Sequence, residues 1–422
     1  MGLDMGYHKK RYIFKNTCRV CGSKNLIKYF DFGNMPLVNS FLAPGEKEAD
    51  KIPLAVMFCN DCSNSQLNTV VDSKYLFSNY IYHSSISKTF QKHCLAMAKN
   101  IKNLFKNKNN LKCFDIASND GCLLKEFQKE GYKVIGVEPA KNLSKIANAQ
   151  GIKTINSFWN MNIAKKILKE FGKADIVTAT NVLAHVDDVH GFVSAVYEVL
   201  SDKGVFVIEI PYLRELIRNN EFDTIYHEHL SYFLVKPLIK LFSMHKMKIC
   251  NLSEFDIHGG TIRMGVIKDS NTVIKTNQEI INKFLDIELK EGLHTIKPYK
   301  KLEEKAKLIR KEFLEKLNEI KAKGKKIAGY GASAKGNVFV NYCSLDKEDI
   351  DFIVDDTKDK QGLLYPGTKI PILSNDRIKK EKPDYLLILA WNFADEIIKK
   401  NKKYKTSGGK YIIAIPKLQV IK

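Results

Sequence analysis

Four cysteines near the N-terminus constrain the fold of this chain more than any other feature of its sequence. They occur as two Cys-x-x-Cys pairs, Cys18 with Cys21 and Cys59 with Cys62. Each pair can present two thiolates from one tight turn, and two such turns complete the tetrahedral sulfur shell of a zinc ion. Because four cysteines leave no coordination position for a reacting water, we expect this zinc to be structural. The alternatives are buried structural thiols or a redox pair, although a redox Cys-x-x-Cys typically occurs once, beside a βαβ unit.

Length and composition indicate an ordered protein with two or three domains. The chain has 422 residues, of which 44% are hydrophobic. Its length exceeds that of a protein built around one ordinary hydrophobic core. Its net charge of +21 comes from 68 basic and 47 acidic residues, but only seven of the basic residues are arginines. Because proteins that read nucleic acids favour arginine, we interpret the excess as a solvated lysine-rich surface and expect no nucleic-acid partner. The N-terminus has basic residues but no apolar signal region, and no stretch is long enough to span a bilayer, so we expect a cytoplasmic protein without a membrane partner.

A strand–turn–helix pattern follows the cysteine region. The run that begins at Lys112 predicts a buried strand, then a small-residue turn that includes Ala117 and Gly121, and then a helix that begins around Cys122. A second strand at 132–138 ends in Glu138, which lies 23 residues after Asp115 and thus one βαβ unit further along. An acid at this position can accept hydrogen bonds from both ribose hydroxyls of an adenosine-containing ligand.

The turn favours S-adenosylmethionine over a dinucleotide. A dinucleotide site would carry Gly-x-Gly-x-x-Gly, which seats a pyrophosphate at the helix N-terminus. This turn has a single glycine, and Asp120 would repel a phosphate, whereas S-adenosylmethionine has no phosphate and is cationic at sulfur. An ordinary loop without a ligand is the alternative. The predicted cofactor-binding residues are Asp115, Ala117, Ser118, Asn119, Asp120, Gly121 and Glu138.

Further strands predict two α/β units joined by helices. Strands expected at 174–181 and 204–211 complete a doubly wound parallel sheet. Residues 271–323 show helical apolar spacing in a Lys/Glu-rich background with a break near Pro298, which indicates two connecting helices. A second, smaller Rossmann-like unit is expected beyond them, with strands at 326–330, 351–356, 385–391 and 411–416.

The second unit begins with a glycine-rich turn. The string Gly-Tyr-Gly-Ala-Ser-Ala-Lys-Gly-Asn spans residues 329–337 and follows an expected strand. It offers backbone donors, Ser333 and Lys335 as a partial phosphate cradle, but it matches neither a Walker loop nor Gly-x-Gly-x-x-Gly. A structural strand-to-helix turn is therefore the alternative.

A dense polar stretch, Tyr226-His227-Glu228-His229, follows the first α/β unit. A zinc-protease helix would need His-Glu-x-x-His, and the residue four after His227 is Ser231, so that interpretation fails. A mononuclear iron site would need a third ligand from elsewhere and stays open. A histidine with a pKa near 6.5 can take a proton at neutral pH, and an adjacent carboxylate and tyrosine can orient it.

Taken together, these motifs resemble the zinc-containing, S-adenosylmethionine-dependent sugar C-methyltransferases, which act on C3 of nucleotide-linked 4-keto-deoxysugars. The resemblance covers nearly the whole chain and also includes Asn181 with His185. The family usually has glycine and threonine where this chain has Ala117 and Cys122, and neither change removes a polar contact.

The resemblance implies that His229 removes the proton next to the ketone and that the resulting enolate carbon accepts the methyl group. It implies catalytic roles for His229, Glu228, Tyr226 and Tyr80, and substrate binding by Asn181, His185, Tyr82, Lys335, Asn337 and Ser333. The implied cofactors are S-adenosylmethionine and structural zinc, and the implied partner is a nucleotide-linked keto-sugar. The alternatives are an O- or N-methyltransferase acting on another nucleotide sugar or small molecule, and a zinc-ribbon nucleic-acid-binding protein.

The expected architecture is an α/β monomer with four segments. They are a zinc-binding domain at 1–80, a class I methyltransferase domain at 81–270, a helical connection at 271–323 and a C-terminal Rossmann-like nucleotide-sugar-binding domain at 324–422.

Overall fold

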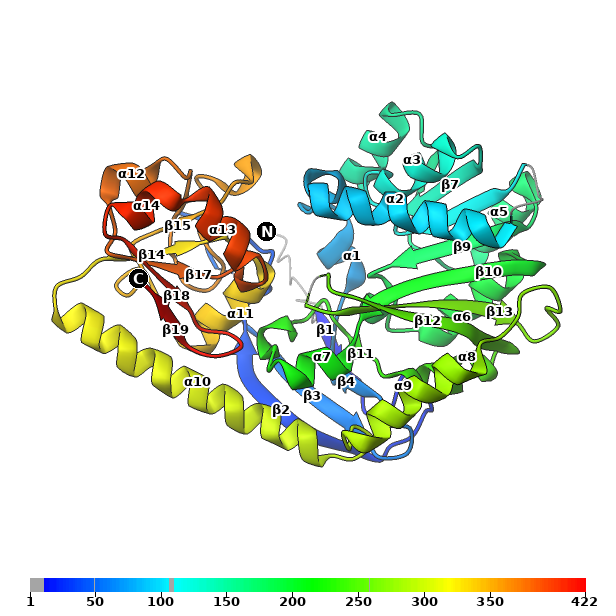
Figure 1. Cartoon of the computed structure of the whole chain (residues 1–422), viewed down its shortest axis with the longest axis horizontal. Helices are drawn as coiled ribbons and strands as arrows, with labels where there is room; N and C mark the ends of the chain where they lie inside the picture. The colour runs from blue at the N-terminus through cyan, green and yellow to red at the C-terminus, as the bar shows by residue number, and fades with distance from the viewer. Residues whose placement is uncertain (1–10, 49, 106–109, 258) are drawn as a thin grey trace, which may run out of the picture.

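Two α/β lobes face each other across a smaller sheet at the base of the molecule, and a long helix runs from that base to the C-terminal lobe (Figure 1). The computed structural model describes residues 11–48, 50–105, 110–257 and 259–422. Most of the basic N-terminal segment considered above therefore lies outside the described residues. Within the described ranges, no helix combines the length and the apolar character that a bilayer crossing requires.

The sheet at the base belongs mainly to the zinc lobe. Its strand order is β11–β4–β3–β2, and all neighbours are antiparallel. The strands are β2 (Leu26–Met35), β3 (Ile52–Cys59), β4 (Ser65–Leu67) and β11 (Ser231–Tyr232), and a separate pair joins β1 (Tyr12–Phe14) to β5 (Thr69–Val71). Because β11 comes from far along the chain, this sheet reaches the polar stretch that ends at His229.

The central domain is built on a seven-stranded sheet with the order β12–β13–β10–β9–β6–β7–β8. Its strands are β6 (Lys112–Ile116), β7 (Lys133–Glu138), β8 (Thr154–Asn156), β9 (Ala174–Thr180), β10 (Leu200–Pro211), β12 (Met247–Phe255) and β13 (Thr261–Lys268). The five strands from β10 to β8 are parallel, and β12 and β13 are antiparallel. Parallel strands covered on both faces form continuous apolar runs, which explains why the sequence predicted four of these five strands; the short β8, of three residues, was not predicted.

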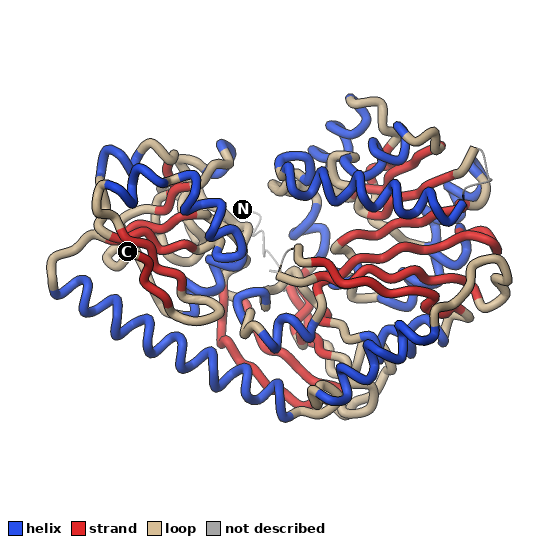
Figure 2. Tube along the Cα trace, viewed as in Figure 1, coloured by secondary structure: helices blue, strands red, loops and turns tan. Residues whose placement is uncertain are grey.

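Helices cover the central sheet on both faces (Figure 2). They are α2 (Lys88–Lys102), α3 (Cys122–Lys129), α4 (Lys141–Ala149), α5 (Met161–Phe171), α6 (Val189–Val199) and α8 (Val235–Ser243). Shorter elements are α1 (Ser73–Phe77), α7 (Leu213–Arg218) and the 3₁₀ helices η1 (Ser84–Ile86), η2 (Asn103–Phe105), η3 (Leu183–His185) and η4 (Phe222–Thr224).

Two helices connect the lobes, α9 (Gln278–Lys290) and α10 (Lys297–Ala322). Pro298 lies in the first turn of α10, where its missing N–H costs no helical hydrogen bond and its fixed φ favours the helix. With 26 residues, α10 is about 39 Å long at 1.5 Å per residue. Its buried stripe, which includes Tyr299 and Phe313, packs on the core, and its Lys/Glu-rich face is solvated.

The C-terminal lobe repeats the α/β design on a smaller scale. Its sheet has the order β16–β15–β14–β17–β18–β19, with the first five strands parallel and the last antiparallel. The strands are β14 (Ile327–Tyr330), β15 (Ile353–Val354), β16 (Ile372–Leu373), β17 (Tyr385–Ile388), β18 (Lys410–Ile413) and β19 (Gln419–Ile421). The helices are α11 (Ala334–Tyr342), α12 (Arg377–Glu381), α13 (Ala394–Lys400) and α14 (Lys402–Thr406), with 3₁₀ turns η5 (Lys358–Lys360) and η6 (Trp391–Phe393).

Candidate active site between the two lobes

One large cavity, of about 1400 Å³, opens between the two lobes. Its wall combines the cofactor turn of the central domain, the polar stretch around His229 and the glycine-rich turn of the C-terminal lobe. Sites for one small molecule typically measure about 300–1,000 Å³, so this cavity has room for two ligands side by side.

Three of the seven predicted cofactor-binding residues line the cavity, Ala117 and Asn119 from the cofactor turn and Glu138 from the end of β7. The carboxylate of Glu138 accepts hydrogen bonds from the backbone N–H of Asn119 and of Ala140, both at 2.8 Å. Burial raises the pKa of Glu138, and these two N–H donors oppose that shift. The acid at the end of β7 is therefore held in a defined orientation at the cavity edge.

The other four predicted cofactor-binding residues, of which Asp115 lies in β6 and the rest in the turn, are not part of the cavity wall. Asp115 accepts a hydrogen bond from the Thr178 hydroxyl at 2.6 Å, and burial raises its pKa to about 7. Asp120 accepts a hydrogen bond from the backbone N–H of Ser85 at 3.0 Å. Ser118 and Gly121 complete the turn, which has positive φ at Ala117, Asn119 and Gly121. These four residues support the turn from the side that faces away from the cavity.

The turn also holds the segment that carries the two predicted tyrosines. The Asn119 side chain accepts from the backbone N–H of Ser84 at 3.0 Å and donates to the carbonyl of Tyr82 at 3.1 Å. Tyr80 and Tyr82 both line the cavity. The side chain of Asn119 therefore ties the tyrosine segment to the cofactor turn.

Buried polar atoms without partners lie beside this turn. The Oγ1 of Thr180 and the Oδ1 of Asn181 are buried and make no hydrogen bond within the described part of the chain, and both residues line the cavity. Unsatisfied buried polar atoms are costly, and a polar ligand would satisfy them. Together with the carboxylate of Glu138, they fit an adenosine-containing cofactor.

His229 lines the cavity, and its protonation pattern follows from one contact. Its Nδ1 lies 2.8 Å from the carbonyl oxygen of Thr224. Because a carbonyl only accepts hydrogen bonds, Nδ1 carries the proton and Nε2 keeps its lone pair. Burial and the neighbouring His185 hold the pKa of His229 well below its usual value, so the ring is neutral at physiological pH.

The aromatic surroundings of His229 fix the plane of its ring. The Tyr226 ring lies 4.1 Å away between centroids, and the His185 ring lies 5.0 Å away in an edge-on arrangement. Burial lowers the pKa of His185 to about 4. His185, Tyr226 and Asn181 all line the cavity, so the structure gathers these predicted residues at one place.

Glu228 does not orient His229, contrary to the expectation from their adjacency. Its buried carboxylate accepts hydrogen bonds from the Tyr80 hydroxyl at 3.0 Å and from the Asn39 amide at 2.6 Å. Burial raises the pKa of Glu228 to about 7. The ring of His229 is instead held by the Thr224 carbonyl. Glu228 forms a separate hydrogen-bonded pair with Tyr80.

His227, between these residues, has a structural contact. It is 1% exposed, and its Nε2 donates to the carbonyl of Ile52 in β3 at 3.2 Å. Its burial lowers its pKa to about 4. The zinc lobe thus anchors the polar stretch through this ring.

The glycine-rich turn of the C-terminal lobe brings Ser333 and Lys335 to the cavity. Ser333 caps α11, because its hydroxyl accepts from the Gly336 N–H at 3.0 Å. Asn337 is fully buried behind the turn, does not line the cavity and donates to the Pro366 carbonyl at 2.9 Å.

Several cavity residues escaped the sequence analysis. Asp355, at the end of the second strand of this lobe, could have been found by the reasoning that singled out Glu138. Lys360 lines the cavity and donates to the carbonyl of Ala332 at 2.8 Å, and Asn39 comes from the zinc lobe. No local pattern marks Lys360 or Asn39, because only the tertiary fold brings them here.

The four N-terminal cysteines lie as a metal site requires. Their sulfurs are all within 4.8 Å of one another, with 3.5 Å between Cys18 and Cys62 and between Cys21 and Cys59. A zinc ion bound at about 2.3 Å to each sulfur would set sulfurs about 3.8 Å apart. The donor set and its spacing therefore fit a structural zinc.

Three family models match consecutive parts of the chain. They describe a zinc binding domain over residues 18–77, a methyltransferase domain over residues 90–244 and a C-methyltransferase C-terminal domain over residues 256–416.

Individual proteins also match. C-methyltransferase NovU of Streptomyces niveus is 32% identical over 408 residues, which are 96% of this chain and 97% of that protein. Ubiquinone biosynthesis O-methyltransferase of Bartonella quintana is 29% identical over 119 residues, which are 28% of this chain and 48% of that protein. The crystal structure of magnesium protoporphyrin IX methyltransferase from Synechocystis with bound S-adenosylmethionine covers 42% of this chain and 79% of its own, with 12% identity and a TM-score of 0.32.

The match to NovU extends over nearly all of both chains, and the family models account for the tetra-cysteine zinc-binding site, the methyltransferase fold and the C-terminal lobe. The chain therefore belongs to the C-methyltransferases with an N-terminal zinc-binding domain, and it is an S-adenosylmethionine-dependent C-methyltransferase.

Proposed function

We propose that the chain methylates a carbon next to the ketone of a nucleotide-linked keto-deoxysugar. The observation that carries this proposal is the neutral imidazole of His229 in a cavity with room for two ligands. Its Nδ1–H is committed to the Thr224 carbonyl, so Nε2 is available as a base. A ketone acidifies the neighbouring C–H, and a neutral imidazole suits its removal.

The cofactor supplies the other half of the reaction. S-adenosylmethionine, when bound against Ala117, Asn119 and Glu138, supplies an electrophilic methyl group. His229 takes the proton from the carbon that will carry the methyl group, and the electron pair of that C–H bond moves into an enolate. The proton then resides on Nε2 of His229, and the ring stays oriented because Nδ1 remains bound to Thr224.

Tyr80 and Glu228 support the enolate oxygen in this proposal. Burial raises the pKa of Glu228 to about 7, so its protonated form is accessible at neutral pH. The hydroxyl of Tyr80 bonds to it at 3.0 Å, so the pair can supply a proton or a strong hydrogen bond at the cavity. Donors aimed at a developing oxyanion in a site shielded from water are among the largest contributions to catalysis.

The C-terminal lobe supplies the chemistry for the nucleotide part of the substrate. Ser333, Lys335 and Lys360 surround the glycine-rich turn at the cavity. Two ammonium groups beside backbone N–H donors suit a diphosphate. Asp355 lines the same wall, where its carboxylate suits a sugar hydroxyl of the nucleoside.

Isotope exchange at the acceptor carbon tests the proposal. In D₂O, with S-adenosylhomocysteine in place of the methyl donor, the wild type should exchange the hydrogen next to the ketone, and His229→Asn should not. His229→Asn should keep cofactor binding by calorimetry and lose methyl transfer by at least about a hundredfold, the usual size of a general-base contribution.

His245→Asn is the matched control, because His245 does not line the cavity and its ring contacts His190 and Ser194 rather than the polar stretch around His229. It should retain wild-type exchange and turnover. Undiminished turnover of His229→Asn would remove His229 as the base, and methylation at oxygen or nitrogen without carbon exchange would replace the proposal by the O- or N-methyltransferase alternative.

A further inference from the structure

Four consecutive residues, 221–224, connect the C-terminal lobe to the imidazole of His229. Phe222–Thr224 form the 3₁₀ helix η4 in the central domain. The first three residues of this group each contact the C-terminal lobe, and the fourth supplies the carbonyl that binds His229. We call residues 221–224 the coupling segment.

The contacts to the C-terminal lobe are polar at two positions and aromatic at the third. Glu221 lies 3.4 Å from the ammonium of Lys335. Asp223 accepts a hydrogen bond from the indole N–H of Trp391 at 2.7 Å. The Phe222 ring packs on two rings of α11, with centroids 6.5 Å from Phe339 and 5.3 Å from Tyr342.

Asp223 is the most constrained member of the coupling segment. It is 1% exposed, and its Oδ1 has no hydrogen-bond partner within the described ranges. Burial raises the pKa of Asp223, while Lys335 and the Trp391 N–H oppose that shift. A buried carboxylate with so few donors depends strongly on each of them, so the Trp391 contact is a major anchor.

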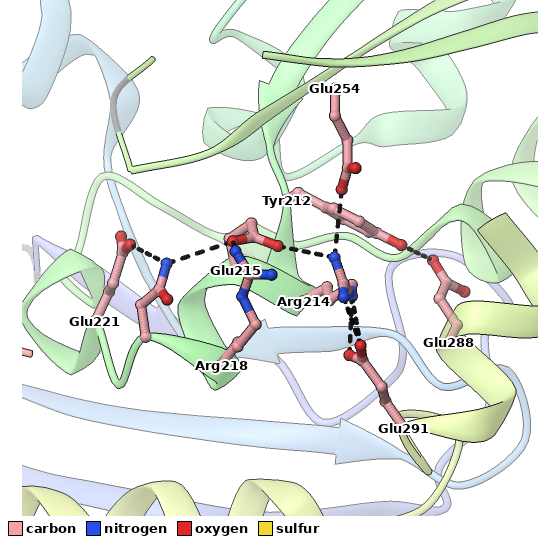
Figure 3. Close-up of polar contacts among 9 residues, drawn as sticks. Tyr212, Arg214, Glu215, Arg218, Glu221, Glu254, Glu288 and Glu291 are labelled. Atoms are coloured by element: carbon pink, nitrogen blue, oxygen red, sulfur yellow. Dashed lines mark hydrogen bonds and ion pairs between the residues drawn. The ribbon is translucent and has the colours of Figure 1, made fainter. Parts of the chain in front are cut away.

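The segment is tied to the central domain as well. Glu221 accepts from the Asn219 amide at 3.3 Å, and Asn219 lies 3.4 Å from Glu215. Glu215 pairs with Arg214, which in turn pairs with Glu291 beyond α9 (Figure 3). Glu221 thus lies between this network and Lys335, so it contacts both lobes.

The consequence for the base follows from chain connectivity. Thr224 is bonded to Asp223, and its N–H donates to the Glu221 carbonyl at 3.0 Å. Its own carbonyl holds Nδ1 of His229 at 2.8 Å. A shift of Asp223 therefore moves the acceptor that fixes the tautomer and direction of the ring.

We propose that Asp223 and Trp391 are positioning residues for His229, so that docking of the C-terminal lobe on the coupling segment sets the geometry of the base. The inference rests on the proposed role of His229. It also links the base to substrate binding, because Lys335 lies at the cavity and its ammonium is 4.6 Å above the Trp391 ring. Lys335, which is proposed to bind the nucleotide, and Asp223, which is proposed to position the base, therefore both contact Trp391.

Trp391→Phe tests the proposal, because it keeps the aromatic ring and removes the N–H. At saturating concentrations of both substrates, kcat should fall by about tenfold to a hundredfold, the cost of a misplaced catalytic group, with cofactor affinity unchanged. Asp223→Ala should behave similarly. Asp223→Asn, whose amide oxygen still accepts from Trp391, should retain more activity than Asp223→Ala.

Tyr342→Phe is the matched control, since it keeps the ring that packs on Phe222 in the same interface. It should leave kcat unchanged. A second readout does not need turnover: in ¹⁵N-histidine-labelled protein, the Nδ1–H resonance of His229, assigned by its loss in His229→Asn, should weaken or shift in Trp391→Phe and stay unchanged in Tyr342→Phe.

The outcomes separate the two proposals. If the wild type methylates no keto-sugar, the proposed function fails, and the resonance of His229 still decides whether Trp391 positions the ring. If Trp391→Phe keeps both the wild-type kcat and the wild-type resonance, the positioning proposal is overturned.

Discussion

The carboxylates of Glu138 and Asp355, on opposite sides of one cavity, are each held by two backbone N–H groups in the same arrangement. Glu138 is the last residue of the second strand of the central βαβ unit and accepts from the N–H groups of Asn119 and Ala140, both at 2.8 Å. Asp355 follows the equivalent strand of the C-terminal lobe and accepts from the N–H groups of Ala332 at 2.7 Å and Thr357 at 2.8 Å. In each case one donor lies in the turn after the first strand and the other lies two residues downstream of the acid.

This correspondence predicts that the two acids serve different ligands. Glu138→Ala should weaken cofactor binding by about tenfold to a hundredfold, the value of a hydrogen bond to a charged group, and leave nucleotide-sugar affinity unchanged. Asp355→Ala should do the reverse. Calorimetry with S-adenosylhomocysteine and with a nucleotide sugar measures both, and loss of both affinities in either variant would contradict separate sites.

Removal of zinc should destabilise more than the N-terminal lobe. The four-cysteine site lies in the lobe whose strand β3 anchors His227. Structural zinc contributes on the order of 10 kcal/mol to the folding of small domains. We expect about one zinc per chain, a lower melting temperature and loss of turnover after chelation. Cys59→Ser should reproduce this, whereas Cys122→Ser should keep its zinc. A chelated protein with an unchanged melting temperature and turnover would show that the metal is dispensable.

The acidic limb of the pH–rate profile should lie below the ordinary histidine pKa of 6.5. The pKa of His229 is lowered, so the neutral ring persists as the pH falls past 6.5, and activity declines only when the lowered pKa is reached. An acidic limb of kcat/KM at or above pH 6.5 would contradict this prediction.

The same change of pH also alters the free energy of unfolding, which should be measured alongside the rate. His185 and His227 have pKa values of about 4 in the folded chain, so the unfolded chain binds more protons between about 6.5 and 4. These two rings therefore contribute stability that is lost as the pH falls through that window. Asp115 and Glu228 have raised pKa values of about 7, so their contribution increases as the pH falls and opposes that of the histidines.

Ala117 offers a test of backbone strain in the cofactor turn. Its φ is +55°, a conformation that costs a residue with a Cβ about 1 kcal/mol or more and that glycine adopts freely. Ala117→Gly should therefore leave the free energy of unfolding unchanged or raise it by up to about 1 kcal/mol. Ala117→Val should lower it, because branched side chains fit this conformation worst. Denaturant titrations measure both, and a marked loss of stability in Ala117→Gly would show that the methyl group is needed for packing.

Local patterns in the sequence predicted the parallel strands and the metal ligands well. Strands such as β6 and β9 are buried on both faces and read as apolar runs, and the cysteine pairs encode their own turns. The antiparallel strand β12 was harder to recognise, because exposed polar residues such as Lys248 and Asn251 interrupt it.

The internal contacts of the site could not be predicted in the same way. Adjacency in sequence suggested that Glu228 orients His229, but the two side chains point to different partners. The orienting group is the carbonyl of Thr224, which any residue type would provide, so no side-chain pattern can reveal it. Asn39 reaches Glu228 from the zinc lobe, and such a contact exists only once the chain is folded.

The placement of β11 limits how this enzyme can be taken apart. Ser231 and Tyr232 pair with Gln66 and Ser65, so a strand from the catalytic half completes the sheet of the metal lobe. A fragment that begins at residue 81 would lack β4, so β11, the strand that follows His229, would lose its partner and leave an open sheet edge. The first two of the three consecutive family segments are thus interleaved in space, and exchange of either one between relatives must preserve this pairing for the hybrid enzyme to work.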